Sequence, residues 1–363
     1  MGSEQQAIVE QPYDSEKAGA FVGRVFGDVA SSFVVVCCAL GDRYGLFKDL
    51  DAHGPHTGEE LAACAGVAPR YVQEWASCLT VAGYLAYDPK TERFSLPADH
   101  APALAREPGP FFLGGFFQQL GALLALYGPL AQAFKDGRGI APELYTEDIW
   151  KGEFRANDMW HNHLLVEEWV PKMPAVREAL ERGARVADVG SGSGRALVRL
   201  AQAFPKSAFV GFDIDGPSVE RARALAAAEG VSDRVRFEVL DLTRGVPGTY
   251  DIVTAFDVLH DTADPLGVLR SVRKALGPGG RFVVLEINGA DRLEDNASPF
   301  GTVFYGISLA FCMSIAIARG GEGLGTAGLP EGRLRAYAAQ AGFSDVRRVE
   351  INDPIQALFE VSA

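Results

Sequence analysis

The sequence is poor in cysteine and in positive charge. Its 363 residues include five cysteines, an odd number without any C-x-x-C pair, so no disulfide framework is expected. We expect free thiols and a cytoplasmic location, because residues 1–15 are polar and lack the apolar stretch of a secretory leader. Lysine and arginine number 34 against 47 acidic residues, which gives a net charge of −13. That balance disfavours nucleic acid as a partner, since binding it requires the neutralisation of phosphates.

The stretch VADVGSGSG, from Val186 to Gly194, carries the clearest local pattern. The apolar run at 185–189 predicts a buried strand, the glycines and serines predict a turn, and RALVRLAQAF predicts a helix. A strand, a glycine turn and a helix form the first unit of a doubly wound α/β domain. The glycines adopt backbone angles closed to other residues and let a ligand lie against the main chain.

Carboxylates stand at the ends of the strands that follow. Four more apolar runs predict these strands, at 208–212, 235–240, 251–256 and 281–287. Counting the strand at 185–189 as the first, Asp213 and Asp241 end the second and third, FDVLHD ends the fourth, and Glu286 lies in the fifth. A ligand in this fold crosses the carboxyl ends of the strands, so Asp213 is placed to bind the two hydroxyls of a ribose.

In this order and spacing, VADVGSGSG, GFDIDGPSVERAR, FEVLDL, FDVLHD and ALGPGGRFVVLE resemble the class I S-adenosylmethionine-dependent methyltransferases. FDVLHDTADPLGVLR, EDNASPFGTVFY and LRAYAAQAGFSDVRRVE resemble a bacterial small-molecule subgroup with an N-terminal winged-helix-like region. The resemblance implies an α/β fold, with a Rossmann-like seven-stranded sheet whose last strand is antiparallel. It also implies three regions. Residues 1–110 would form a mainly helical, winged-helix-like dimerisation domain, and 111–180 a helical linker that covers the pocket. Residues 181–363 would form the catalytic domain, with an insertion at 288–330.

The same resemblance assigns a cofactor site for S-adenosylmethionine, with S-adenosylhomocysteine as the product. The residues implied are those along the methionine and sugar, at the ribose, at the adenine and at the end of the fourth strand: Asp188, Gly190, Ser191, Gly192, Asp213, Ile214, Asp241, Leu242, Phe256 and Asp257. Ser191 departs from the cysteine that many members have, but serine is small enough to keep the turn. The partner implied is a small-molecule methyl acceptor.

His260 is the candidate general base. It lies just past the fourth strand, and imidazole titrates near neutral pH. Asp261 either orients His260 or caps the next helix, and the alternative for His260 is a structural role in the loop. A sulfur acceptor needs little or no base, so the sequence leaves oxygen, nitrogen and sulfur open as the methylated atom.

Four aromatic and polar residues outside the predicted strands are candidates for binding the acceptor: Trp160, His161, His163 and Tyr305. Glu286, at the end of the last of these strands, is either a contact of the acceptor or a carboxylate that supports the residues in contact with it. His161 and His163 are two residues apart and therefore point in different directions on a helix, so they do not form a metal pair. No metal is expected.

The N-terminal third predicts helices and a small hairpin. Residues 16–47 are so apolar that the predicted helix should be buried on several sides, which in this subgroup implies a homodimer. Residues 57–96 predict a winged-helix-like unit, whose acidic residues outnumber the basic ones and disfavour DNA reading. Residues 111–134 are long and apolar, but glutamines, a proline and glycines interrupt them. We therefore expect a buried helix or a wall of the substrate pocket, and no membrane partner.

Three other functions are compatible with parts of the sequence. One is a transcription regulator that responds to S-adenosylmethionine through the winged helix. Another is an NAD-type oxidoreductase, which fits the glycine turn and Asp213 but not FDVLHD. The third is a protein that binds the cofactor without chemistry, which the intact motifs and His260 make the weakest alternative.

Overall fold

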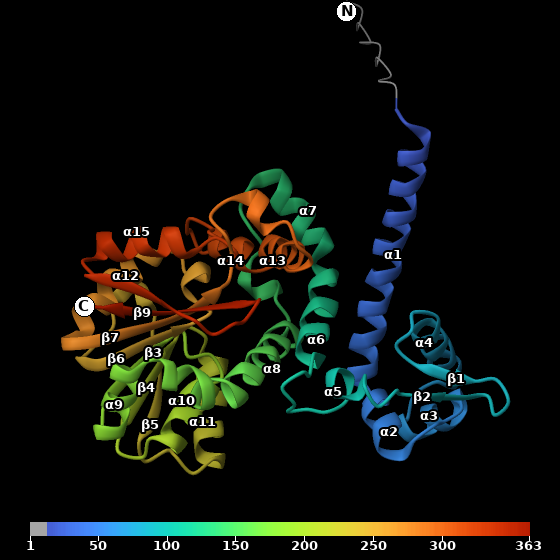
Figure 1. Ribbon diagram of the computed structural model, residues 1–363, viewed down its shortest axis with the longest axis horizontal. Helices are drawn as coiled ribbons and strands as arrows, with labels where there is room; N and C mark the ends of the chain where they lie inside the picture. Colours follow the sequence, from blue (N-terminus) through green and yellow to red (C-terminus); the bar gives the residue numbers. More distant parts are fainter. Residues whose placement is uncertain (1–12) are drawn as a thin grey trace, which may run out of the picture. The chain divides into compact units, whose positions relative to one another are not determined.

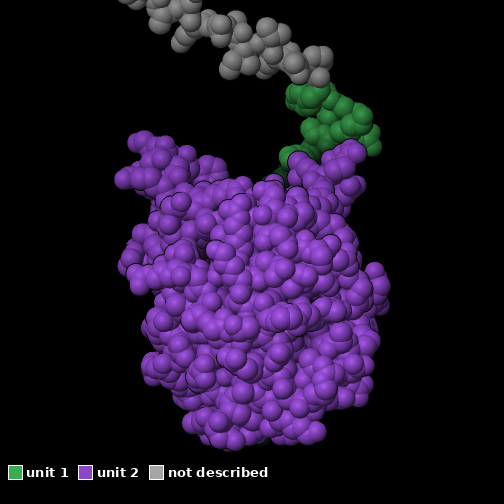
Figure 2. Space-filling view, turned by 90° about the vertical axis from the view of Figure 1, so that its left-hand side faces the viewer, with its two compact units in different colours: residues 1–105 green, residues 106–363 purple. Residues whose placement is uncertain are grey.

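The computed structural model describes residues 13–363, so most of the predicted polar tail at 1–15 lies outside the described residues. The chain divides into two compact units, Met1–Ala105 and Arg106–Ala363, which Figure 2 colours separately. The boundaries expected from the sequence at residues 110 and 180 stay a prediction.

The first unit is mainly helical, with one small antiparallel hairpin (Figure 1). Its elements are α1 (Ser15–Arg43), α2 (Leu46–His53), α3 (Gly58–Ala65), α4 (Pro69–Val81), β1 (Ala86–Asp88), β2 (Arg93–Ser95) and α5 (Ala101–Leu104). The single helix expected over 16–47 is broken, because Gly45 takes a left-handed conformation with φ of 68° and starts α2. The capping box is present: Glu60 N donates to Thr57 Oγ1 and Thr57 N donates to Glu60 Oε2.

Helix α1 is not buried as the sequence led us to expect. Phe26 is 71% exposed and Phe33 is 62% exposed, and α1 buries only Cys38 and Gly41 among its described residues. The expectation is wrong for the single chain, because this unit packs only the last turns of α1. By length and composition alone, two helical stretches are apolar enough to cross a membrane, Ser15–Arg43 and Pro299–Ala318.

The second unit begins with helices and continues as an alternation of strands and helices. Its helices are α6 (Gly114–Leu123), α7 (Tyr127–Asp136), α8 (Glu147–His163), α9 (Pro174–Arg182), α10 (Arg195–Ala203), α11 (Gly216–Ala228), α12 (Pro265–Ala275), α13 (Pro299–Ala310), α14 (Cys312–Ala318) and α15 (Glu331–Ala341). Shorter helical turns lie at 124–126, 142–144, 165–172, 242–244, 259–261 and 293–296. The long apolar stretch at 111–134 is therefore divided between α6 and α7.

The strands of this unit form one seven-stranded sheet in the order β5-β4-β3-β6-β7-β9-β8. They are β3 (Arg185–Val189), β4 (Ala208–Asp213), β5 (Val235–Val239), β6 (Tyr250–Phe256), β7 (Leu276–Ile287), β8 (Asp345–Val349) and β9 (Gln356–Ser362). Neighbours from β5 to β7 are parallel, whereas β9 runs antiparallel to both β7 and β8. The seven-stranded Rossmann-like sheet with an antiparallel last strand is confirmed.

Alternating strand residues build a core on each face of the sheet. Val186 belongs to a core cluster with residues of α9, α10 and α11, and its neighbour Ala187 belongs to a cluster with residues of α12 and α15. Figure 1 shows these two groups of helices on opposite faces of the sheet. Consecutive strands run outward from β3 to β5 on one side and from β6 to β7 on the other. The order therefore reverses between β3 and β6, and in such sheets ligands bind at the carboxyl ends of the strands beside this reversal.

Candidate active site

A cavity of about 490 Å³ opens at the carboxyl ends of β3, β4, β5 and β6. All ten residues that the sequence assigned to the cofactor line it, although they come from four separate strand ends: Asp188, Gly190, Ser191, Gly192, Asp213, Ile214, Asp241, Leu242, Phe256 and Asp257. The fold thus brings together residues up to 69 positions apart in the sequence (188 to 257). Their individual roles stay predictions.

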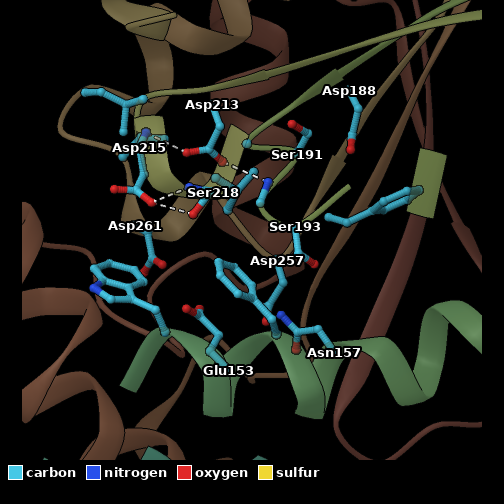
Figure 3. Close-up of a pocket in the computed structure, with 18 of the residues that line it drawn as sticks. Glu153, Asn157, Asp188, Ser191, Ser193, Asp213, Asp215, Ser218, Asp257 and Asp261 are labelled. Atoms are coloured by element: carbon cyan, nitrogen blue, oxygen red, sulfur yellow. Dashed lines mark hydrogen bonds between the residues drawn. The ribbon is translucent and has the colours of Figure 1, made fainter. Parts of the chain in front are cut away.

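Asp213 connects the glycine turn to the end of β4. Its Oδ2 accepts a hydrogen bond from Gly192 N at 2.8 Å, and its Oδ1 accepts one from Asp215 N at 2.9 Å. Figure 3 shows both bonds at the upper edge of the cavity. Burial raises the pKa of Asp213, although the two backbone donors act against the shift. Each oxygen keeps a second lone pair, so the carboxylate can accept further hydrogen bonds from a pair of hydroxyls.

The glycine turn lies against the loop after β6. Gly190 has φ of 73°, and a Cβ added there would lie 2.3 Å from Val258 Cγ2. The preceding residue, Asp257, has φ of 55°, a left-handed conformation that is uncommon for a residue other than glycine. Such strain persists only where the surrounding structure holds it, and it is concentrated at functional sites. Here it aims the Asp257 side chain into the cavity.

Buried carboxyl groups dominate the cavity wall. Burial raises the pKa of Asp188 to about 7, and it does the same for Asp257. Thr254 Oγ1 donates to Asp188 Oδ1 at 2.6 Å, whereas Asp257 Oδ1 is buried and has no hydrogen-bond partner among the described residues. A buried acceptor without a partner is costly in the free protein, so it favours a ligand that brings a donor or a positive charge.

Helix α8 supplies one wall of the cavity. It lies in the segment 111–180 that the resemblance implied would cover the pocket, but of its lining residues only His161 was named from the sequence. Glu153 and Asn157 project from it toward the strand ends, and Glu153 faces Asp257 and Asp261 (Figure 3). Burial, followed by the nearby Asp261 and Asp257, raises the pKa of Glu153 well above its usual range. The signal was present: the lining residues of α8 recur every three or four positions, as one face of a helix does. These residues are Trp150, Glu153, Phe154, Asn157, Asp158 and His161.

The insertion after β7 closes another side of the cavity. Phe311, Ile315 and Arg319, which lie in or next to α14, belong to the lining. These residues belong to the insertion that the resemblance implied at 288–330, so part of the insertion lines the cavity.

His260 lies behind the cavity wall and does not line it. It is 2% exposed, and its Nδ1 is 2.6 Å from Glu286 Oε2. Its Nε2 is 3.1 Å from Asp261 Oδ1, and Asp261 itself does line the cavity. Burial alone would lower the pKa of His260, but Asp261 and Glu286 raise it well above the usual range. The imidazole thus lies between two carboxylates, which favour its charged form.

Of the five residues assigned to the acceptor, only His161 lines the cavity. Burial lowers the pKa of its imidazole to about 4, with Arg195 adding to the shift, so the ring is neutral at pH 7. Trp160 is buried in the core against Phe116, and His163 Nε2 lies 2.9 Å from the carbonyl oxygen of Pro108.

Glu286 and Tyr305 also lie off the cavity. Glu286 is 1% exposed and paired with His260, and Tyr305 is 44% exposed on α13. On α8, by contrast, His161 lines the cavity while Trp160 and His163 do not, because neighbours on a helix point in different directions.

Comparison with known protein families identifies the domains that form and flank this cavity. Residues 180–308 match the family described as a methyltransferase domain, and residues 32–106 match the Rv2258c-like winged HTH domain. The chain carries a methyltransferase domain. The resemblance to class I methyltransferases with an N-terminal winged-helix-like region is therefore confirmed, and the cavity lies within or beside the methyltransferase domain.

Individual relatives match parts of this chain. O-demethylpuromycin-O-methyltransferase of Streptomyces alboniger is 34% identical over 118 residues, which are 32% of this chain and 31% of that protein. Aclacinomycin 10-hydroxylase RdmB of Streptomyces purpurascens is 39% identical over 114 residues, or 30% of each chain. The matches span roughly a third of the length of such curated relatives.

Solved structures extend the likeness over the whole fold. Human N-acetylserotonin methyltransferase in complex with S-adenosylmethionine has a TM-score of 0.67 at 18% identity, covering 99% of this chain and all of that one. This likeness shows that the two chains share a fold.

Proposed function

We propose that the protein transfers a methyl group from S-adenosylmethionine to a small-molecule acceptor, with a hydroxyl oxygen as the favoured methylated atom. The observation that carries the proposal is the convergence of the ten cofactor residues on one cavity within or beside the methyltransferase domain. The relatives named as O-methyltransferases support oxygen as the acceptor atom.

The cavity fits this cofactor by charge as well as by position. When bound, S-adenosylmethionine supplies a methyl group on a positively charged sulfur. Asp188 and Asp257 would favour that charge, and the unpartnered Asp257 Oδ1 would gain a donor. Asp213 would hold the ribose hydroxyls. The side chains of α8 and α14 would exclude water and hold the acceptor in line with the transferred group.

The proton of a hydroxyl acceptor would leave through Asp261 and not directly to His260. Asp261 lines the cavity and stands between it and the His260 ring. A group that takes a proton from the acceptor must be within hydrogen-bond reach of it. His260, held by Glu286, would orient Asp261 and stabilise its charge, so this proposal reverses the two roles that the sequence suggested.

Cofactor choice is the sharpest test of the proposed site. Binding to the purified full chain should be measured by calorimetry with S-adenosylmethionine, S-adenosylhomocysteine and NAD. We expect the first two to bind and NAD not to bind. Binding of NAD alone would overturn the proposal and favour an oxidoreductase, for which the glycine turn and an acidic residue such as Asp213 are also suitable.

The winged-helix-like unit at 57–96 has few basic side chains available to contact DNA phosphates. Of the basic residues of its helices and hairpin, Arg93 pairs with Glu60 at 2.6 Å and Arg70 pairs with Glu74, so neither is free for a phosphate. A regulator that binds DNA needs such contacts. We therefore propose a role in assembly for this unit, and the cytoplasm as its location.

The partner proposed for α1 is a second copy of the chain. Large apolar side chains recur along the helix and are exposed in the single chain: Phe21, Val22, Val25, Phe26, Val29, Phe33, Val36 and Leu40. A contiguous apolar helix face of this length is typical of a protein–protein contact. Pairing two such helices would bury the face that each leaves open.

A further inference from the structure

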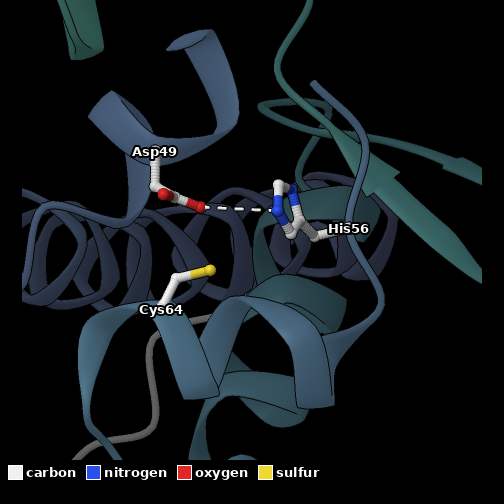
Figure 4. Close-up of side chains that lie close together, drawn as sticks. All are labelled: Asp49, His56 and Cys64. Carbon is white, nitrogen blue, oxygen red and sulfur yellow. Dashed lines mark ion pairs between the residues drawn. The ribbon is translucent and has the colours of Figure 1, made fainter. Parts of the chain in front are cut away.

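We propose that Asp49, His56 and Cys64 bind a zinc ion in the first unit. One candidate ligand atom from each residue lies within 4.8 Å of the other two. The residues come from α2, from the segment between α2 and α3, and from α3. Figure 4 shows the sulfur of Cys64 pointing toward the other two side chains. Nothing in the methyl-transfer proposal uses this cluster.

His56 is already arranged as a metal ligand. Its Nδ1 lies 2.8 Å from the carbonyl oxygen of Gly54 and donates to it, which leaves the lone pair on Nε2. Metal-binding histidines usually donate their other ring N–H in this way, because the bond fixes the tautomer and the ring orientation. The backbone of His56 is also fixed, since it exchanges two hydrogen bonds with Phe94, of 3.0 and 2.7 Å.

The facing atom of Asp49 lacks a hydrogen bond. Asp49 Oδ2 is buried and has no hydrogen-bond partner among the described residues, while Oδ1 lies 2.9 Å from His53 Nδ1. His56 Nε2 and Asp49 Oδ2 are 3.8 Å apart, which is too far for a hydrogen bond. Two atoms bonded to one tetrahedral zinc ion are about 3.3–3.7 Å apart, given zinc bonds of about 2.0–2.3 Å. The 3.8 Å gap is slightly wider than this range, so a small movement of the side chains would let both atoms bind one ion.

The donor set favours zinc over calcium or magnesium. A thiolate, an imidazole and a carboxylate are ligands for zinc and similar transition metals, whereas calcium and magnesium take oxygen ligands. Cys64 is exposed, so its thiol proton can leave to solvent when the metal binds, and a water can complete four ligands. The two negative charges would balance the ion. The bound ion would tie α2 to α3 across the segment that carries His56.

Zinc binding to the metal-free full chain tests the site. We expect one Zn²⁺ per chain with a rise in Tm, and at least about tenfold weaker binding for His56→Gln and for Cys64→Ser. The matched control is His100→Gln, because His100 Nδ1 also lies 2.9 Å from a backbone carbonyl, that of Tyr84, but His100 belongs to no ligand cluster among the described residues. This control should bind Zn²⁺ as the unaltered chain does.

Cobalt gives a readout that a purely structural role of these residues would not change. Co²⁺ in the unaltered chain should show a thiolate-to-cobalt charge-transfer band, and Cys64→Ser should lose it while Cys78→Ser keeps it. Absence of Zn²⁺ binding to the unaltered chain would overturn the proposal. So would unchanged binding in His56→Gln or Cys64→Ser, or an equal loss in His100→Gln, because the ion would then be held elsewhere.

Discussion

Asp213 is the single residue on which the cofactor assignment depends most. Asp213→Asn removes the charge and one acceptor from the carboxyl group that holds Gly192 and faces the cavity. We expect the affinity for S-adenosylmethionine to fall by about 1.5–3 kcal/mol, the scale of hydrogen bonds to a charged group. Calorimetry measures the change, with Asp233→Asn, an exposed residue paired with Arg234, as the control. Equal affinities in the two variants would remove the ribose assignment.

The raised pKa values of Asp188 and Asp257, both about 7, predict a pH dependence of cofactor binding. Their pKa in the unfolded chain is near the usual value of about 3.9. Because burial disfavours the charged form, the neutral carboxyl groups add to the folding stability of the free protein at low pH. This contribution is lost as the pH rises through about 7. Below pH 7 a cationic ligand must displace a proton. We therefore expect binding of S-adenosylmethionine to weaken from pH 8 to pH 6, by about tenfold for each carboxyl group involved.

S-adenosylhomocysteine is the matched ligand for this titration, because it lacks the positive sulfur. Its affinity should change less between the two pH values, and Asp257→Asn should reduce the change for S-adenosylmethionine. An identical pH response of both ligands would contradict the assignment of these carboxylates to the sulfonium.

Residues at the strand ends were predictable, whereas those whose direction depends on packing were not. Asp213 and Asp241 follow apolar strands, so their place in the sheet follows from the chain order alone. His260 follows a strand as well, but its ring turns inward because Glu286 of β7 lies behind it. That pairing joins residues 26 positions apart and leaves no local signal in the sequence.

At the scale of elements, the turn after β3 has to be glycine for two reasons. Gly190 and Gly230 both have positive φ, 73° and 69°, but a Cβ would meet Val258 only at Gly190. Gly230→Ala should lower the free energy of unfolding by roughly 1–2 kcal/mol, because alanine is strained in the left-handed conformation. Gly190→Ala should cost a further 1–3 kcal/mol or so from overpacking.

Urea unfolding measures both costs, and the double variant Gly190→Ala, Val258→Ala should recover part of the larger one. Equal losses in the two single variants would show that Val258 moves away freely. The close contact between the glycine turn and the loop after β6 would then not be a constraint on the site.

Helices were predicted less well than strands. The apolar runs between glycine turns mark β3 to β7 almost to the residue, but β7 begins five residues earlier than expected, at Leu276, because Leu276 pairs with Tyr250. The break at Gly45 and most of the lining residues of α8 were missed. Gly45 and the spacing on α8 are visible in the sequence, but the apolar pattern of a helix does not specify where the helix breaks or which face meets a cavity. The zinc cluster was missed for a similar reason, since its spacing matches no common ligand motif.

At the scale of the whole molecule, the exposed apolar face of α1 predicts that the protein forms a dimer. Phe26→Asp places a charge in the exposed apolar face of α1, so it should convert a dimer into a monomer in sedimentation velocity. Tyr71→Asp is the control, because Tyr71 is 81% exposed and belongs to a different helix, α4. A monomeric unaltered chain would contradict the dimer, and so would flotation of the unaltered chain with lipid vesicles, which would assign α1 to a membrane.

Transfer of a labelled methyl group tests the central claim most directly. Methyl-labelled S-adenosylmethionine should be incubated with the full chain and a panel of phenols, amines, thiols and thioethers. We predict label on a hydroxyl-bearing acceptor, and transfer at least about 100-fold slower in Asp261→Asn with unchanged cofactor affinity. Tight binding of S-adenosylmethionine without label on any acceptor class would contradict the account, as would oxidation of an acceptor in place of its methylation.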